Sequence, residues 1–159
     1  MANPRIRQVS TACKYLLGVA AVCVTLTIST PNSVNIPFIS NKDIKCLADN
    51  IYHEARGEPY AGQVAVARVT LNRVAHSKYP DTICKVVYQR KQFSWTLNKS
   101  AKVKDKRAYL RAWHAAWHAL LTPRGSTTHF HATYVKPKWS TKLTKVRQIG
   151  KHIFYHEPM

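Results

Sequence analysis

Acidic residues are scarce in this chain, and their scarcity makes each of them a candidate for a specific role. The 159 residues include only seven Asp and Glu against 25 Lys and Arg, for a formal net charge of +18. This length excludes a two-lobed kinase or a barrel of eight β/α units and leaves room for one domain. Because 45% of the residues are hydrophobic, the chain has enough apolar side chains to form a core despite its charge.

Several motifs of metal-dependent and nucleophilic enzymes are missing. Residues 53–57, HEARG, begin like the zinc motif HExxH but have Gly at the fifth position. No C-x-x-C, G-x-S-x-G or Walker A sequence occurs. His129 and His131 would point to one side of a predicted strand, where they either line a groove or bind a metal. We favour the groove, with His131 as a substrate-binding candidate, and expect neither metal nor cofactor.

Positive charge gathers in residues 85–111, which hold nine basic residues and one acid, Asp105. Nucleic acid, anionic lipid and the acidic polymers of a bacterial envelope would all attract such a surface. No zinc-finger or RNP-type motif accompanies the charge, so we expect no specific nucleic-acid binding, and anionic wall polymers stay among the candidate partners. The alternative is a solvated basic face that only keeps the protein soluble.

The N-terminal segment has the pattern of an export signal. Residues 1–14 are basic without any acid, and an uncharged, mostly apolar run follows at residues 15–28. This run is either a cleaved signal or, extended to residues 12–30, a weak uncleaved anchor in the inner membrane. A buried helix of the domain is the third alternative. We divide the chain into a leader at 1–40 and a folded domain at 41–159, and expect it in the periplasm or cell envelope.

Two of the four cysteines, Cys46 and Cys84, fall in the expected domain. If the domain is exported, they meet an oxidising compartment and are expected to pair as a disulfide. The alternative is two buried free thiols.

Hydrophobic spacing predicts a helix-dominated α+β fold with a small β element. A first helix is expected from a Ser40 cap, supported by Asp43, to a stop near Gly57. Further helices are expected at 61–75, 83–88 and 104–121, extended chain at 92–97, and strands at 129–135 and 152–156 separated by a loop. In the second helix, Arg68 and Arg73 fall away from the apolar stripe. The last helix has its own stripe, formed by Leu110, Trp113, Trp117, Leu120 and Leu121.

Glu54 continues the apolar stripe of the first helix, with Ile44, Leu47 and Ile51 at spacings of three and four. Burial and the negative end of the helix dipole would both raise its pKa. A carboxylic acid that keeps its proton near neutral pH can protonate a glycosidic oxygen. The alternative is a structural acid paired with a nearby arginine. No second carboxylate stands out as a partner for Glu54.

Four runs resemble the SleB-type cell-wall hydrolase family: residues 50–74, 79–95, 129–139 and 149–155. They contain E-A-R-G-E, G-Q-x-A-V-A, L-N-R-V and Q-F-S, in the family's order, and the resemblance covers about residues 44–156. It implies a lysozyme-like fold similar to lytic transglycosylases, and an enzyme that cleaves the glycan strands of peptidoglycan.

The resemblance also implies roles for single residues. Glu54 matches the family's catalytic acid, and Gln92, Phe93 and Ser94 match an element near the substrate cleft. Tyr134 falls in an aromatic block that also lies near the cleft. A cysteine pair matching Cys46 and Cys84 recurs in similar members.

We therefore expect a lytic transglycosylase that acts on the β-1,4 bond between N-acetylmuramic acid and N-acetylglucosamine, with Glu54 as acid and then base. A hydrolytic muramidase assisted by Glu58, and a non-catalytic basic protein that binds envelope or nucleic acid, are the alternatives. The short architecture also resembles phage endolysins of the signal-arrest-release type, and an exported bacterial wall hydrolase is the competing interpretation.

Overall fold

The computed structural model describes residues 39–98 and 101–157. The predicted signal or anchor therefore lies outside the described residues. Within the described ranges, no helix is both long and apolar enough to cross a membrane. The elements in chain order are α1 (Asn41–Ala55), α2 (Tyr60–Val74), α3 (Ile83–Val87), the 3-10 helix η1 (Ser94–Leu97), α4 (Lys106–Leu121), β1 (Thr127–Ala132), the 3-10 helix η2 (Lys138–Thr141), β2 (Thr144–Ile149) and β3 (His152–His156).

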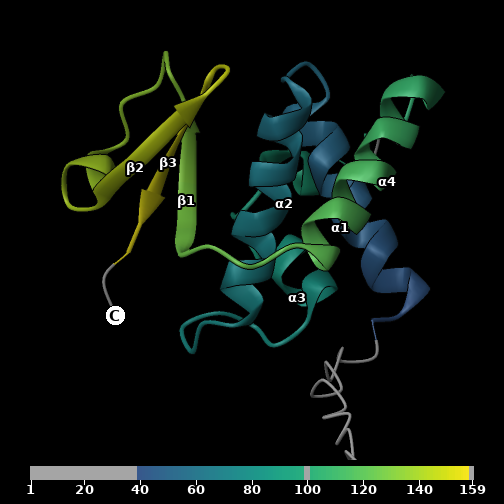
Figure 1. The fold of residues 1–159 in the computed structure, drawn as a ribbon, viewed down its shortest axis with the longest axis horizontal. Helices are drawn as coiled ribbons and strands as arrows, with labels where there is room; N and C mark the ends of the chain where they lie inside the picture. The colour runs from purple at the N-terminus through teal and green to yellow at the C-terminus, as the bar shows by residue number, and fades with distance from the viewer. Residues whose placement is uncertain (1–38, 99–100, 158–159) are drawn as a thin grey trace, which may run out of the picture. The chain divides into compact units, whose positions relative to one another are not determined.

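The predicted helix-dominated α+β class is confirmed. Figure 1 shows the helices gathered on one side and an antiparallel sheet on the other, with β1 next to α2. The strand order is β1-β3-β2, so the last strand lies in the centre of the sheet. The larger core lies among α1, α2, α3 and α4, and a smaller core joins Phe154 of β3 to Ala55, Val66 and Val69. The C-terminal end of α1 is thus packed between helices and sheet.

The first helix begins where its cap predicts. Ser40 Oγ accepts a hydrogen bond from the Asp43 backbone N–H at 3.1 Å and donates one to Asp43 Oδ2 at 2.7 Å. A capped first turn with an acidic side chain is stabilised by satisfied N–H groups and by the helix dipole. Ile44, Leu47 and Ile51 are then buried, and Leu47 and Ile51 belong to the larger core.

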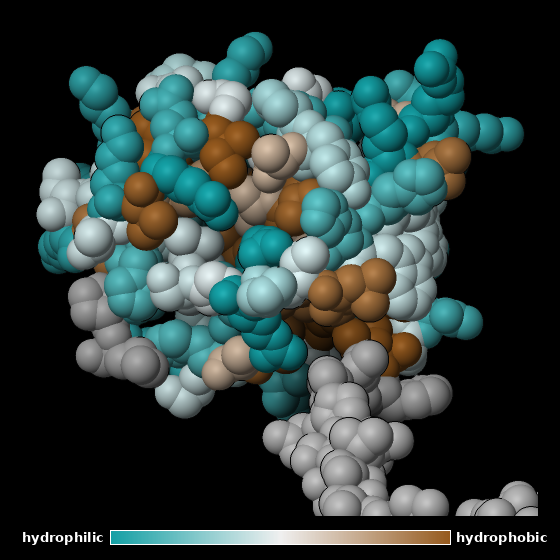
Figure 2. Space-filling model, viewed as in Figure 1, coloured by the Kyte–Doolittle hydropathy of each residue, from teal (hydrophilic) through white to brown (hydrophobic). Residues whose placement is uncertain are grey.

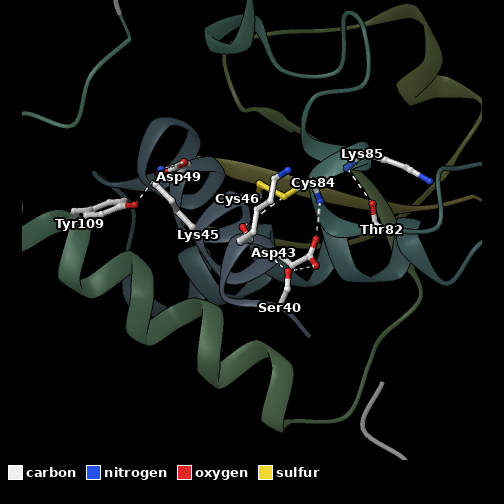
Figure 3. Close-up of a disulfide and its surroundings, with 10 residues drawn as sticks. Ser40, Asp43, Lys45, Cys46, Asp49, Thr82, Cys84, Lys85 and Tyr109 are labelled. Carbon is white, nitrogen blue, oxygen red and sulfur yellow. Dashed lines mark hydrogen bonds and ion pairs between the residues drawn. A yellow bond between two sulfur atoms is a disulfide. The ribbon is translucent and has the colours of Figure 1, made fainter. Parts of the chain in front are cut away.

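Cys46 of α1 and Cys84 of α3 form the predicted disulfide. Figure 3 shows the bond where the two helices meet, with Asp43 close to Cys84. Asp43 Oδ1 accepts a hydrogen bond from the Cys84 backbone N–H at 3.3 Å. The short helix α3, with only five residues, is therefore attached to α1 both covalently and by its backbone.

The predicted apolar stripe of α4 is wrong in part. Leu110 and Leu121 are 58% and 73% exposed, whereas the face turned to the core is made of small residues. These are Ala108, Ala112, Ala115, Ala116 and Ala119. Small side chains let α4 approach α1 and α2 closely. The closely packed alanine face is therefore buried, and the face with the larger Leu110 and Leu121 is not.

Two local predictions also need correction. Residues 94–97 form a 3-10 helix instead of extended chain, and a strand, β2, replaces part of the loop expected before β3. Hydrophobic spacing could not predict β2, because it is an edge strand whose side chains are mostly exposed and polar. The strand predicted at 152–156 is confirmed.

Candidate active site

Glu54 lies in the last turn of α1, where the helix reaches the smaller core. Its side chain is half-buried. Burial raises the pKa of Glu54 to about 7 from an ordinary 4.5, and the positive charge of Arg73 opposes part of that rise. A carboxyl with this pKa is largely protonated in mildly acidic surroundings and can exchange its proton near neutral pH.

All seven Asp and Glu side chains of the chain lie within the described residues. They differ in whether they have a hydrogen-bond or ion-pair partner. Six have hydrogen bonds or ion pairs with protein groups, namely Asp43, Asp49, Glu58, Asp81, Asp105 and Glu157. Glu54 has neither a hydrogen bond nor an ion pair with any residue in 39–98 or 101–157. Among the described residues, Glu54 is thus the one carboxyl that no protein group holds in place.

The structural alternative, an ion pair between Glu54 and a nearby arginine, has Arg56 and Arg68 as its candidates, and both are engaged elsewhere. Arg56 donates to the Tyr52 carbonyl and lies over the Tyr52 ring. Arg68 donates to the Pro123 carbonyl and to Thr122 Oγ1.

Arg73, near the end of α2, provides the cationic side of the site. Although the hydrophobic spacing places Arg73 away from the apolar stripe of α2, its side chain is buried, with 6% of its surface exposed. Its Nε donates to the Thr128 carbonyl at 2.7 Å and its Nη1 donates to Gln92 Oε1 at 3.1 Å. The rings of Tyr79 and Phe93 lie against its guanidinium, with centroids 5.3 and 5.7 Å from Cζ. The Arg of the L-N-R-V motif was the signal that could have identified it.

A second group of residues holds η1 against the end of α1. The ring of Trp95 stacks on His53, the neighbour of Glu54, with centroids 4.4 Å apart. Trp95 Nε1 donates to Asn50 Oδ1 at 3.2 Å, and Asn50 Nδ2 donates to Thr70 Oγ1 at 3.3 Å. Burial, and after it the charge of Arg56, lowers the pKa of His53, which favours a neutral ring beside the acid. Trp95 was not among the predicted site residues, although it follows Q-F-S directly.

The predicted cleft residues have different surroundings. Gln92 joins the site through Arg73, whereas Phe93 is only 3% exposed. The ring of Phe93 packs against the guanidinium of Arg73, and its contact with substrate stays a prediction. Ser94 is exposed at the start of η1, and Tyr134, in the turn after β1, is 83% exposed. Their substrate contacts stay predictions.

His131 belongs to an aromatic cluster on the sheet. Its ring stacks on Tyr155, its Nε2 lies 2.9 Å from Tyr155 Oη, and Trp139 packs edge-on against both. His129 also contacts Trp139. The two histidines thus share one side of β1, as predicted, and its role as a groove stays a prediction. No cluster of three or more His, Cys, Asp and Glu in the described part of the chain could hold a metal ion.

Glu58, the other acid near the end of α1, supports the β2–β3 turn. Its Oε2 accepts a hydrogen bond from the Lys151 backbone N–H at 2.8 Å. Gly150 precedes this residue with a φ of +56°, and a Cβ at position 150 would collide with the Glu58 carboxylate. Both the left-handed backbone and the close approach require glycine. Glu58 therefore has a structural role in the turn.

The raised pKa of Glu54 predicts how stability depends on pH. Between pH 4.5 and about 7 the folded state binds the extra proton, so the free energy of unfolding falls as the pH rises. The loss is complete above the folded pKa and amounts to about 3 kcal/mol. Urea unfolding of the native chain and of Glu54→Gln should give similar stabilities near pH 4.5 and favour Gln above about pH 8. A difference that does not change with pH would contradict the burial of this carboxyl.

Three comparisons with known proteins agree on one relationship. A family model described as Cell Wall Hydrolase matches residues 57–155. Spore cortex-lytic enzymes of Oceanobacillus iheyensis and Bacillus subtilis are 38% and 33% identical to this chain over 130 and 122 residues, which are 77% and 72% of this chain. The matched segments are 45% and 38% of those enzymes, so this chain spans less than half of their length.

The fold is also similar to solved structures. The catalytic domain of the germination-specific lytic transglycosylase SleB from Bacillus anthracis is 30% identical, with a TM-score of 0.64. The match covers 79% of this chain and 99% of that domain. The catalytic domain of the Bacillus cereus SleB protein gives the same identity and TM-score, with 94% of that domain covered.

Proposed function

The chain belongs to the Cell Wall Hydrolase family, and on this basis we propose that it is a lytic transglycosylase that cleaves peptidoglycan glycan strands with Glu54 as its acid and base. The expected bond is the β-1,4 bond between N-acetylmuramic acid and N-acetylglucosamine. The family, the solved SleB catalytic domains and the free carboxyl in the last turn of α1 support this proposal.

The reaction needs one proton donor that later takes a proton back. The Glu54 carboxyl donates its proton to the glycosidic oxygen, the bond from that oxygen to C1 of the muramic acid breaks, and C1 becomes electron-poor. The Glu54 carboxylate then removes the proton of the C6 hydroxyl while O6 attacks C1, which closes a 1,6-anhydro ring. Glu54 ends protonated, so neither a cofactor nor a water molecule is consumed. Arg73 stabilises the carboxylate between the two steps.

The main support for the proposal is that six of the seven carboxylates have partners among the described residues and Glu54 has none. Hydrolysis by the common glycosidase routes uses two carboxyl groups, one of which activates water or attacks the sugar. Glu58 accepts the Lys151 N–H, and the other five acids have partners of their own. With one free acid, an attack by the substrate's own hydroxyl is favoured over hydrolysis.

Product analysis tests the reaction. The purified chain should release fragments from peptidoglycan that end in 1,6-anhydro-muramic acid, and mass spectrometry separates these from reducing ends by the mass of one water. Reducing ends throughout would contradict the transglycosylase and favour the muramidase alternative.

We further propose that the domain acts outside the cytoplasm, with residues 1–40 as its export or anchoring leader. The disulfide between Cys46 and Cys84 supports an oxidising compartment. An endolysin of the signal-arrest-release type and a bacterial wall enzyme are both consistent with this arrangement.

The basic surface before and at the start of α4 is proposed to hold the enzyme to anionic wall polymers. Lys102, Lys104 and Lys106 are exposed there, and long hydrophilic side chains project at the upper right of Figure 2, where Figure 1 has the start of α4. Replacing the three lysines by Gln should weaken binding to purified walls about fivefold at low salt and flatten its salt dependence. Co-sedimentation at several salt concentrations measures both effects.

The matched control removes the same charge elsewhere. Lys138, Lys142 and Lys145 are exposed around η2 and β2. Their replacement by Gln should have the smaller effect. Equal losses in the two triple variants would mean that net charge, rather than this surface, determines wall binding.

A further inference from the structure

The outward side of α4 has large apolar side chains that are not part of either core. Leu110, Trp117 and Leu121 are 58%, 46% and 73% exposed. At about 100° per residue, the three side chains fall within about 40° of one another around the helix, so they form one stripe. Trp113 and Leu120 lie beside this stripe and are half-buried against the larger core.

The stripe belongs to a wider hydrophobic surface. Figure 2 shows hydrophobic side chains gathered where Figure 1 has the C-terminal end of α4. Single apolar residues are ordinary on a protein surface, but a row of large ones along one helix indicates a surface that meets another molecule.

Basic side chains follow the stripe along one flank of the helix. Four residues are exposed there, namely Arg107, Arg111, His114 and His118. Residues 106–125 contain no Asp or Glu. The acid just before them, Asp105, caps α4 by accepting a hydrogen bond from the Ala108 backbone N–H at 2.9 Å. The exposed side of α4 is therefore apolar along one line and cationic along the next.

We propose that this face of α4 binds the surface of an anionic lipid bilayer. Leu110, Trp117 and Leu121 enter the boundary between head groups and acyl chains, and Arg107 and Arg111 meet the lipid phosphates. A helix that lies in this boundary needs an apolar side and a cationic flank on the same exposed surface. Trp is enriched at this depth, because its ring is apolar and its N–H is polar.

Other partners fit only half of this face. Wall polymers and nucleic acids offer negative charge to Arg107 and Arg111 but no apolar layer for the two leucines. A second copy of the chain offers an apolar surface, but a symmetric contact brings the same arginines toward each other, with no acid in residues 106–125 to pair with them. An anionic bilayer supplies both the charge and the apolar layer.

The α4 face and the candidate active site lie on different sides of the helices. α4 packs on α1 and α2, and Figure 1 shows α4 and the sheet on opposite sides of α2. Glu54 lies at the end of α1 where the smaller core joins the helices to Phe154 of β3. A chain bound to a bilayer through α4 therefore keeps the sheet side open to glycan strands. Membrane binding by this face is independent of the reaction at Glu54.

A photoreactive benzoylphenylalanine at position 121 of the full-length chain tests the contact. A crosslink to lipid reports on this face even when residues 1–40 also hold the chain to the membrane. The control probe stands at position 134, where the native Tyr134 is 83% exposed. The vesicles contain phosphatidylglycerol and phosphatidylethanolamine, or phosphatidylcholine alone. On the anionic vesicles, lipid adducts per bound chain should be about tenfold more frequent at position 121 than at 134, and they should be rare on phosphatidylcholine.

Two double variants of the chain with the probe at position 121 separate the parts of the face. Arg107→Gln with Arg111→Gln should lower the adduct yield on anionic vesicles about fivefold. Leu110→Gln with Trp117→Gln should lower it by a similar factor. The matched control Lys142→Gln with Lys145→Gln removes the same charge near η2 and β2 and should leave the yield unchanged. All six side chains are exposed, so circular dichroism should show the same fold for every variant.

Three results would overturn the membrane site: equal adducts at positions 121 and 134, equal adducts on the two kinds of vesicle, or an unchanged yield in either double variant of the face. Adducts that join two chains in place of lipid would also overturn it and assign the face to a dimer. Adducts to residues 1–40 of the same chain would overturn it as well, and assign the face to the leader. The lipid adducts need no catalysis, so a chain without lytic activity can still confirm the membrane site.

Discussion

Replacement of Glu54 by Gln is expected to reduce the rate of peptidoglycan cleavage by about 10²- to 10⁴-fold, the usual contribution of a general acid or base. Gln keeps the shape of the side chain but can neither donate a proton to the glycosidic oxygen nor take one back from the C6 hydroxyl. The measurement is the release of soluble fragments from purified peptidoglycan by equal amounts of folded protein. Lytic activity within a few-fold of the native chain would contradict the assignment.

Two control variants, each of which removes a different carboxylate, test whether the loss of activity is specific to Glu54. Asp81→Asn removes an exposed carboxylate paired with Lys85, and activity should be unchanged. Glu58→Gln keeps an oxygen that can accept the Lys151 N–H, so the β2–β3 turn should hold. If Glu58→Gln abolishes activity as completely as Glu54→Gln while the fold persists, a two-carboxylate hydrolysis is favoured instead.

Removal of the disulfide is expected to cost about 4 kcal/mol of the free energy of unfolding, from the chain entropy of a loop closed over 38 residues. The double variant Cys46→Ala with Cys84→Ala leaves no free thiol at this place. Guanidinium unfolding of the variant and the oxidised native chain measures the difference.

The bond also holds a short helix in place. The helix α3 has five residues, too few to form a stable helix alone, and it packs on α1 through Ile83 and Val87. Reduction of the native chain should reproduce the loss. If the reduced chain and the double variant both unfold at the same denaturant concentration as the oxidised protein, the bond contributes nothing to stability.

Much of the helical layer could be predicted because its causes are local. The Ser40 cap, the apolar spacing of α1 and the position of Glu54 on that stripe depend on residues three or four apart, and the structure confirms the helix start and the burial of the stripe. The raised pKa expected for Glu54 follows from the same periodicity, and burial is its main cause in the structure. The resemblance supplied what periodicity could not, namely the family.

Several features of the site could not be predicted from local patterns. The spacing placed Arg73 off the apolar stripe of its helix and could not predict its burial. That burial depends on the Thr128 carbonyl, 55 residues later in the chain, and on the rings of Tyr79 and Phe93. The burial of Phe93 against this arginine likewise depends on tertiary packing. The exposed strand β2 has no apolar alternation that could have predicted it. Its pairing with β3 depends on backbone hydrogen bonds, which any sequence can form.

The amino-acid sequence alone determined the scarcity of acids, the helix that carries Glu54 and the cysteines that can pair, because composition and short-range spacing are properties of the chain itself. Only the tertiary structure decided that six of the seven carboxylates have partners, that alanines rather than leucines face the core from α4, and that a buried arginine stands near the remaining acid. Those outcomes depend on which distant groups meet when the chain packs, since hydrogen bonds and close contacts form between neighbours in space.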